Sequence, residues 1–271
     1  MKRRDLEKVV EKHLAHIQKF SQQIPGHFVP EDIHELRVEY KKLRAFTRLV
    51  QLERGAGDLR ILPKLKSLYH AAGEVRDIQH LLQQLATISG KYPLPEFIKY
   101  WEQVLFAAKE QLVKEIEKAD FGKMQENMSQ HLPDTLEENT IEKFIHRKVA
   151  AIHIILMAAE QDKDLHSIRK NLKDIIYEIR IFKSDLGLPF PVKAWKSEKL
   201  LNDMTVKLGD FNDQSILISY LHSGYSKIVS AGEQTIIDNW RQSLELQKEK
   251  LKQFLFQQVL RLQLVHDFQS I

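Results

Sequence analysis

The chain has 271 residues, of which 43% are hydrophobic and 29% charged, with a formal net charge of +4. This length and composition are sufficient for the hydrophobic core of one large or two medium domains, which excludes an intrinsically disordered chain. The absence of cysteine excludes disulfides and thiolate chemistry. Because the net charge is small, affinity for a polyanion would depend on how the charges are distributed.

The pattern of apolar residues predicts an all-α fold, because they recur at helical spacing and no run alternates as in a β-strand. Clusters of proline and glycine separate the helical segments. The pattern predicts eight helices in a single domain, four in an N-terminal repeat (1–133) and four in a C-terminal repeat (134–271). In chain order the predicted helices cover 3–24, 30–53, 58–88, 94–130, 137–160, 163–185, 193–222 and 231–266.

Two features predict a cytoplasmic protein without a membrane segment. The first residues, MKRRDLEKVV, are charged throughout and do not lead into the apolar run of a secretion signal. The longest apolar stretch, 149–159, is far shorter than the roughly 20 residues that span a bilayer.

The second predicted helix carries a row of basic residues on one face. They lie three, four, three and four residues apart, so they share an arc of roughly 80° on a helix that turns about 100° per residue. Like charges at this spacing repel by on the order of 0.2–0.5 kcal/mol per pair, and the row therefore lowers stability. This first row consists of His34, Arg37, Lys41, Arg44 and Arg48.

The sixth predicted helix repeats this row, which indicates an internal duplication. Only the position of Arg44 is not basic there, because Ile176 occupies it. The next helix of each half also shares a motif, GEVRD at 73–77 and GDFND at 209–213, at a similar distance from the histidine. The second row consists of His166, Arg169, Lys173 and Arg180.

Apolar residues flank both rows, so we expect the basic side chains to face inward, into a shared cleft. Inward cations must be paired or bind a ligand, because burying unpaired charge costs more than repulsion between solvated charges. Few acidic residues are placed where they could pair with these cations; the best candidates are Asp77, Asp213 and Glu74. A bound polyanion therefore accounts better for the charge of the two rows than internal acids do. The remaining sector of each helix is expected to face solvent; it holds Glu35, Glu39 and Lys42 in the first helix and Ser167, Asn171, Asp174 and Glu178 in the second.

The two histidines lie in the first turns of their helices, where free N–H groups and the helix macrodipole favour anions. The same environment, with cations nearby, is expected to lower the pKa of His34 and His166. A bound polyanion would raise it again, so affinity would increase as the pH falls if the histidines titrate. The alternative is that both stay neutral and only donate hydrogen bonds.

These motifs resemble those of the conserved-histidine α-helical (CHAD) domain family. The resemblance rests on HELRVEYKKLR, GEVRD, HSIRKNLKDIIYE and LGDFND, in the order of the family, and covers nearly the whole chain. It implies two pseudo-symmetric four-helix bundles around a basic channel that binds inorganic polyphosphate, and it implies association with polyphosphate granules. The phosphate contacts that the resemblance implies are His34, Arg37, Lys41, Arg44, His166, Arg169 and Lys173. We add three further candidates, Arg48 and Arg180 from the two rows and Arg76 from the GEVRD motif.

Two other function classes remain open. A nucleic-acid-binding protein would be expected to interleave exposed aromatic side chains with the arginines, and the rows offer only Tyr177. A polyphosphate hydrolase would need a metal site or a nucleophile. Asp77 and Asp213 could form a carboxylate pair, but orienting the arginines is the simpler role.

The inward rows, the duplication and the lack of catalytic motifs, together with the resemblance, favour a non-catalytic polyphosphate-binding module without cofactor or metal. No phosphate-binding glycine loop and no nucleophile motif occurs in the sequence. The only close histidine pair at helical spacing, His13 and His16, belongs to no HExxH motif.

Overall fold

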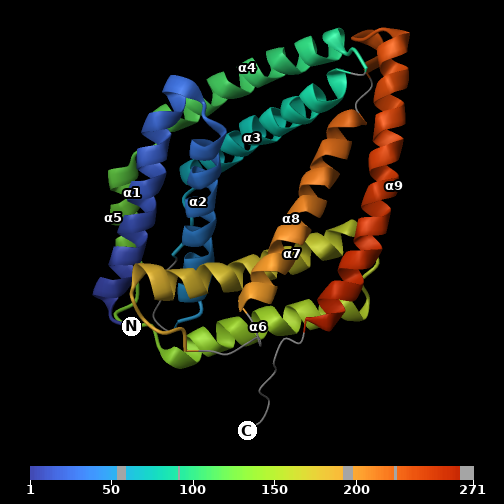
Figure 1. The fold of residues 1–271 in the computed structure, drawn as a ribbon. Helices are drawn as coiled ribbons and strands as arrows, with labels where there is room; N and C mark the ends of the chain where they lie inside the picture. The colour runs from blue at the N-terminus through green and yellow to red at the C-terminus, as the bar shows by residue number, and fades with distance from the viewer. Residues whose placement is uncertain (54–58, 91, 192–197, 223–224, 263–271) are drawn as a thin grey trace.

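Four helical hairpins, arranged like the sides of a frame, form the fold (Figure 1). The computed structural model describes residues 1–53, 59–90, 92–191, 198–222 and 225–262. This part of the chain contains helices and no β-strand, which confirms the predicted all-α fold. The α-helices are α1 (Arg3–His27), α2 (Pro30–Val50), α3 (Pro63–Ser89), α4 (Pro95–Glu117), α5 (Phe121–Gln130), α6 (Glu138–Met157), α7 (Asp162–Arg180), α8 (Glu198–Leu221) and α9 (Ala231–Arg261).

Each side of the frame is a pair of consecutive long helices: α1 with α2, α3 with α4, α6 with α7, and α8 with α9. At the corners, α2 contacts α3 and α7, and α8 contacts α7 and α3. These four helices are called the inner helices below. Buried apolar side chains from all nine α-helices belong to one hydrophobic cluster, so the core runs through every side of the frame.

The starts of several helices follow local rules. Proline, whose fixed φ suits the first turn of a helix, begins α2, α3 and α4. The side chain of Ser230 caps α9 by accepting a hydrogen bond from the Glu233 amide. The predicted starts of α2, α4 and α9 are correct to within one residue. The predicted start of α3 is wrong, because the helix begins only at Pro63 and residues 59–62 are not helical.

One predicted helix, 94–130, is wrong because the chain breaks between α4 and α5. The Asp120 side chain accepts a hydrogen bond from the Lys123 amide at 3.0 Å and so starts the new helix α5, which packs against α1. The described part of residues 1–133 therefore contains five helices where four were predicted.

The remaining boundaries differ slightly from the prediction. α1 continues through Pro25 to His27, and α7 ends at Arg180, where a π-helical turn, η1 (Ile181–Asp185), follows. A short 3₁₀ turn, η2 (Tyr225–Lys227), precedes α9. The predicted helix starts at 58 and 193 and the predicted end at 266 lie outside the described residues. The duplication of 1–133 in 134–271 stays a prediction.

Candidate functional site

All four sequence motifs lie on the inner helices of the frame. The first basic row lies on α2 and the second on α7, and these two helices pack against each other. GEVRD lies on α3 and GDFND on α8, which also contact each other. Segments far apart in the sequence are thus brought together (Figure 1).

Lys41 lies where the two rows meet. Its pKa is about 7, against 10.5 for an ordinary lysine; burial is the largest cause, followed by the repulsion of Arg37, Arg169, Arg76 and Lys173. The pKa of Lys173 is about 8, again through burial first and then through Arg169 and Arg180. Cations from α2, α3 and α7 therefore lie near one another around Lys41.

Arg37 lies in the seam between α2 and α3. Its Nη1 donates a hydrogen bond to the Tyr69 carbonyl oxygen at 3.1 Å, and its guanidinium carbon lies 4.6 Å from the centre of the Tyr69 ring. A Cβ atom on Gly73 would lie 2.0 Å from this Nη1, so glycine is what leaves room for the guanidinium. At the corresponding motif of α8, a Cβ on Gly209 would lie 3.8 Å from Arg169, which is ordinary contact.

Two tyrosines that the sequence analysis did not select adjoin the first row. Tyr40 of α2 and Tyr69 of α3 stack with their ring centres 4.1 Å apart. The Arg44 guanidinium carbon lies 5.8 Å and 5.9 Å from the centres of these rings. Tyr177 of α7 is buried, which raises its pKa to about 12 although Arg169, Arg180 and Arg44 act in the opposite direction.

Three of the predicted arginines, Arg37, Arg44 and Arg169, share an unusual feature. Their Nε atoms are buried and have no hydrogen-bond partner in the described part of the chain. A buried N–H group without an acceptor is costly, and each of these guanidinium groups therefore has one donor that no described residue satisfies.

The last cation of each row, by contrast, has a protein partner. Arg48 donates from Nη1 to Asp174 Oδ2 at 2.9 Å, and Lys148 of α6 donates to the same oxygen at 2.6 Å. Arg180 is exposed and donates from Nη2 to Asn202 Oδ1 at 3.3 Å. Arg48 and Arg180 therefore contribute less free hydrogen-bonding capacity than the cations between them.

Arg76 lies between the two predicted orienting acids at the contact of α3 and α8. Its guanidinium nitrogens lie 3.5 Å from Asp77 Oδ1 and 3.4 Å from Asp213 Oδ2. Burial raises the pKa of Asp77, and Asp213 adds to this, whereas Arg37 and Arg76 lower it. Glu74, the third predicted acid, is exposed.

Both row histidines have a pKa below the ordinary value, in the predicted direction. Burial is the largest cause for each; Arg76 and Lys41 add to it for His34, and Lys170 and Arg169 for His166. Nδ1 of His166 lies in a hydrogen bond 2.8 Å from Oδ1 of Asn212. At neutral pH the two imidazoles are therefore mainly uncharged.

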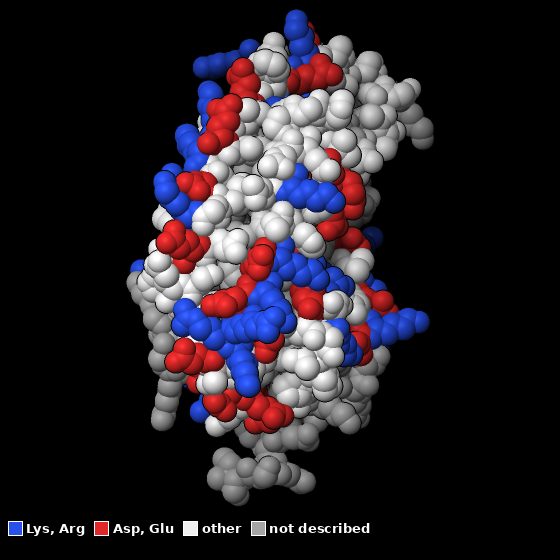
Figure 2. Space-filling model, turned by 90° about the vertical axis from the view of Figure 1, so that its left-hand side faces the viewer, with Lys and Arg blue, Asp and Glu red and all other residues white. Residues whose placement is uncertain are grey.

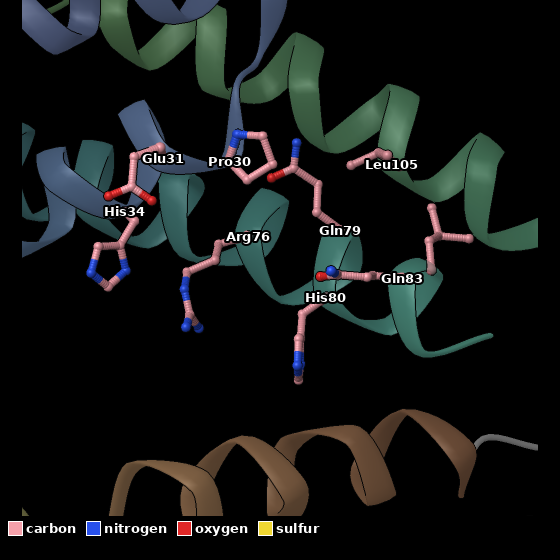
Figure 3. Close-up of a pocket in the computed structure, with 9 residues that line it drawn as sticks. Pro30, Glu31, His34, Arg76, Gln79, His80, Gln83 and Leu105 are labelled. Carbon is pink, nitrogen blue, oxygen red and sulfur yellow. The ribbon is translucent and has the colours of Figure 1, made fainter. Parts of the chain in front are cut away.

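His34 and Arg76 also line a cavity of about 520 Å³ between α2, α3 and α4. Figure 3 shows that their side chains and that of His80 point to the same side, toward α8. His80 was not predicted as a site residue, although it follows the GEVRD motif by one turn of the same helix.

The prediction that one sector of α2 and of α7 faces solvent is wrong for three acidic residues. Helices α1 and α6 cover this side of α2 and α7. Glu39 is buried and accepts a hydrogen bond from Lys42 Nζ at 2.6 Å. Asp174 is buried and binds Arg48 and Lys148. Glu178 is fully buried, and neither carboxylate oxygen has a hydrogen-bond partner in the described chain. Burial, together with Asp174, raises the Glu178 pKa well above its ordinary value.

His13, one of the two histidines considered for metal binding, is fully buried between two carboxylates. Its Nδ1 lies 2.6 Å from Glu39 Oε2, and its Nε2 lies 3.1 Å from Asp185 Oδ2. Burial alone would lower its pKa, but the hydrogen bonds and charges of Asp185 and Glu39 raise it. The described residues contain no group of three His, Cys, Asp or Glu side chains that could hold a metal ion.

The outer face of α1 and α5 has a different charge pattern. Figure 2 shows Lys and Arg interspersed with Asp and Glu over this face, and the densest basic group lies among acidic side chains. Basic residues there form ion pairs with acidic neighbours, as Arg3 does with Glu7 and Lys8 with Asp5. No helix in the described part of the chain is both long and apolar enough to cross a membrane.

The fold and the site define an all-α protein whose inner helices carry rows of basic side chains. The sequence profile of the CHAD domain family matches residues 8–222, and the chain therefore belongs to this family. Membership of the family fits a polyphosphate-related role.

Two solved structures are similar to this fold. The crystal structure of the CHAD domain from the plant Ricinus communis has a TM-score of 0.72 and 15% sequence identity, and covers 97% of this chain and 92% of that chain. PptA from Streptomyces chartreusis has a TM-score of 0.67 and 12% identity, with coverages of 96% and 99%. The chain has no significant match among curated protein sequences.

Proposed function

We propose that the chain is a non-catalytic module that binds inorganic polyphosphate along α2 and α7. The observation that carries the proposal is a group of basic residues that form no ion pair with any described carboxylate, called the unpaired cations here. Their charge is balanced when a polyanion lies between the two helices, which removes the cost of gathering cations in a half-buried place. The unpaired cations are Arg37, Lys41, Arg44, Arg169 and Lys173.

The chemistry of these side chains favours a phosphate polymer. Guanidinium groups match phosphate oxygens with two parallel hydrogen bonds, and lysines act as compact point charges. In this role Asp77 and Asp213 orient Arg76, and His34 and His166 donate hydrogen bonds at the N-terminal ends of α2 and α7.

The aromatic side chains argue against the nucleic-acid alternative. A single-stranded nucleic acid would stack its bases on open aromatic faces. Tyr40 and Tyr69 stack on each other, and Tyr177 is buried, so these three rings offer no such platform.

The test is a binding assay with a double variant, Arg37→Ala with Arg44→Ala. We expect at least a tenfold loss of affinity for polyphosphate with an unchanged helical circular-dichroism signal, because both guanidiniums would contact phosphate. The matched control is Arg4→Ala with Arg147→Ala, which removes the same charge from exposed positions on α1 and α6. Equal affinity of the two double variants would contradict the proposal.

Competition by DNA and RNA at matched phosphate concentration separates the alternatives. Polyphosphate should compete better than either nucleic acid. Binding should also weaken linearly and steeply on a plot of log affinity against log salt, because several counterions are released at once. A shallow slope would contradict binding through several phosphates.

A further inference from the structure

A second basic cavity lies at the other end of the seam between α2 and α3. It has a volume of about 400 Å³, and none of the ten described residues that line it is acidic. We call it the end pocket. Its basic lining residues are Arg44, Arg48, Arg60, Lys66 and His70.

The charges of the end pocket favour an anion. Arg44, one of the unpaired cations, lines the pocket, and its Nε is buried without a hydrogen-bond partner among the described residues. Lys66 and His70 are exposed and form no ion pair with any described residue. Arg48 pairs with the carboxylate of Asp174 and shares this partner with Lys148.

The position of the pocket relates it to the proposed site. Arg44 belongs both to the first row and to the pocket, so the pocket continues the row without interruption. His34 lines the first cavity near the start of α2, and Arg48 lines the end pocket near its end. A helix rises 1.5 Å per residue, which separates these two side chains by roughly 21 Å along α2.

We infer that the end pocket holds phosphate groups of the same polyphosphate chain that lies between α2 and α7, so that affinity depends on chain length. This inference rests on the proposed function. A chain long enough to pass Arg44 gains the contacts of Lys66 and His70, whereas tripolyphosphate is too short to occupy the site and the pocket together. The ligand class is therefore long-chain inorganic polyphosphate.

The test compares Lys66→Gln with Lys64→Gln, using long-chain polyphosphate and tripolyphosphate as separate probes. Both variants remove one positive charge from an exposed position in the first turn of α3. Lys64 instead interacts with Asp120 at the start of α5, away from the pocket, and is therefore the matched control. Lys66→Arg should retain binding, because a guanidinium can replace the phosphate contact.

We expect Lys66→Gln to weaken long-chain binding by up to about fivefold, the upper end of the range of an exposed ionic contact. The variant should also reduce the slope of log affinity against log salt concentration by about 0.7–0.9, the value for the loss of one phosphate contact. The affinity for tripolyphosphate should stay unchanged. Equal effects of Lys66→Gln and Lys64→Gln, or no effect of either, would overturn the inference alone. Absence of polyphosphate binding by the wild type would overturn the proposed function and the inference with it.

Discussion

The low pKa values of Lys41 and Lys173 predict that polyphosphate binding takes up protons and weakens as the pH rises. Raising the pH from 7 to 8 lowers the charged fraction of a lysine with a pKa of about 7 from about one half to about one tenth. For Lys173, with a pKa of about 8, the fraction falls from about nine tenths to about one half.

If bound polyphosphate keeps both lysines charged, the loss of affinity follows from these fractions. It is about fivefold for Lys41 and about twofold for Lys173, or roughly tenfold between pH 7 and 8. The corresponding proton uptake on binding is about 0.6 at pH 7 and about 1.4 at pH 8. These figures hold if His34 and His166, whose pKa values lie below the ordinary value in the empty protein, stay neutral in the complex and only donate hydrogen bonds.

Titration calorimetry in two buffers of different ionisation enthalpy measures both quantities. A long-chain ligand keeps the contribution of its own titrating end groups small. The control is Lys41→Met, which keeps an unbranched side chain without charge; its affinity should fall only about twofold between pH 7 and 8, through Lys173. An unchanged pH dependence in Lys41→Met, or no proton uptake by the wild type, would refute the reasoning.

Three further predictions concern single residues. Gly73→Ala should displace Arg37 and weaken polyphosphate binding, whereas Gly209→Ala should not. In calorimetry, Gly209→Ala should gain up to about 1 kcal/mol of stability, and Gly73→Ala should gain less because Arg37 loses its contacts with Tyr69; equal binding by both variants would contradict the role of Gly73. His13→Gln should lower the unfolding free energy by about 3 kcal/mol at pH 6, because it breaks a buried ion pair. The loss should be smaller at pH 9, where the imidazole has lost its charge, and a loss that does not depend on pH would contradict a charged His13. Glu178→Gln should stabilise the protein increasingly above pH 5, by up to about 1.4 kcal/mol per pH unit, because the wild type must keep Glu178 protonated in order to fold. Thermal unfolding measures this at pH 5 and pH 8, and an equal difference in stability between variant and wild type at both pH values would disprove it.

The sequence predicted the features that depend on one helix at a time. Helical periodicity located the basic rows and the motifs on α3 and α8, because residues three or four apart share a face. The break before α5 was predictable in principle, since Asp120 is a favourable N-cap residue, but no proline or glycine cluster marks it.

Features that depend on contacts between helices could not be predicted in this way. The stack of Tyr40 on Tyr69 joins α2 to α3, and nothing in either helix indicates the partner. The burial of Glu39 and Glu178 depends on which helix covers the second side of α2 or α7. Periodicity identifies an apolar face but does not show that a polar face is also covered, with its charges paired there.

The unpaired cations also have a consequence for folding itself. They repel one another in the empty protein, so the folded state carries an electrostatic cost that the unfolded chain, with its charges far apart, does not. Added salt screens this repulsion and stabilises the empty fold, while the same salt weakens the attraction for a polyanion. A polyanion that binds only the folded state stabilises it by about 2.7 kcal/mol at a concentration one hundred times its Kd. Cells rich in such a polymer would thus contain a more stable protein than dilute buffer does, and purification at low salt would expose the protein in its least stable form.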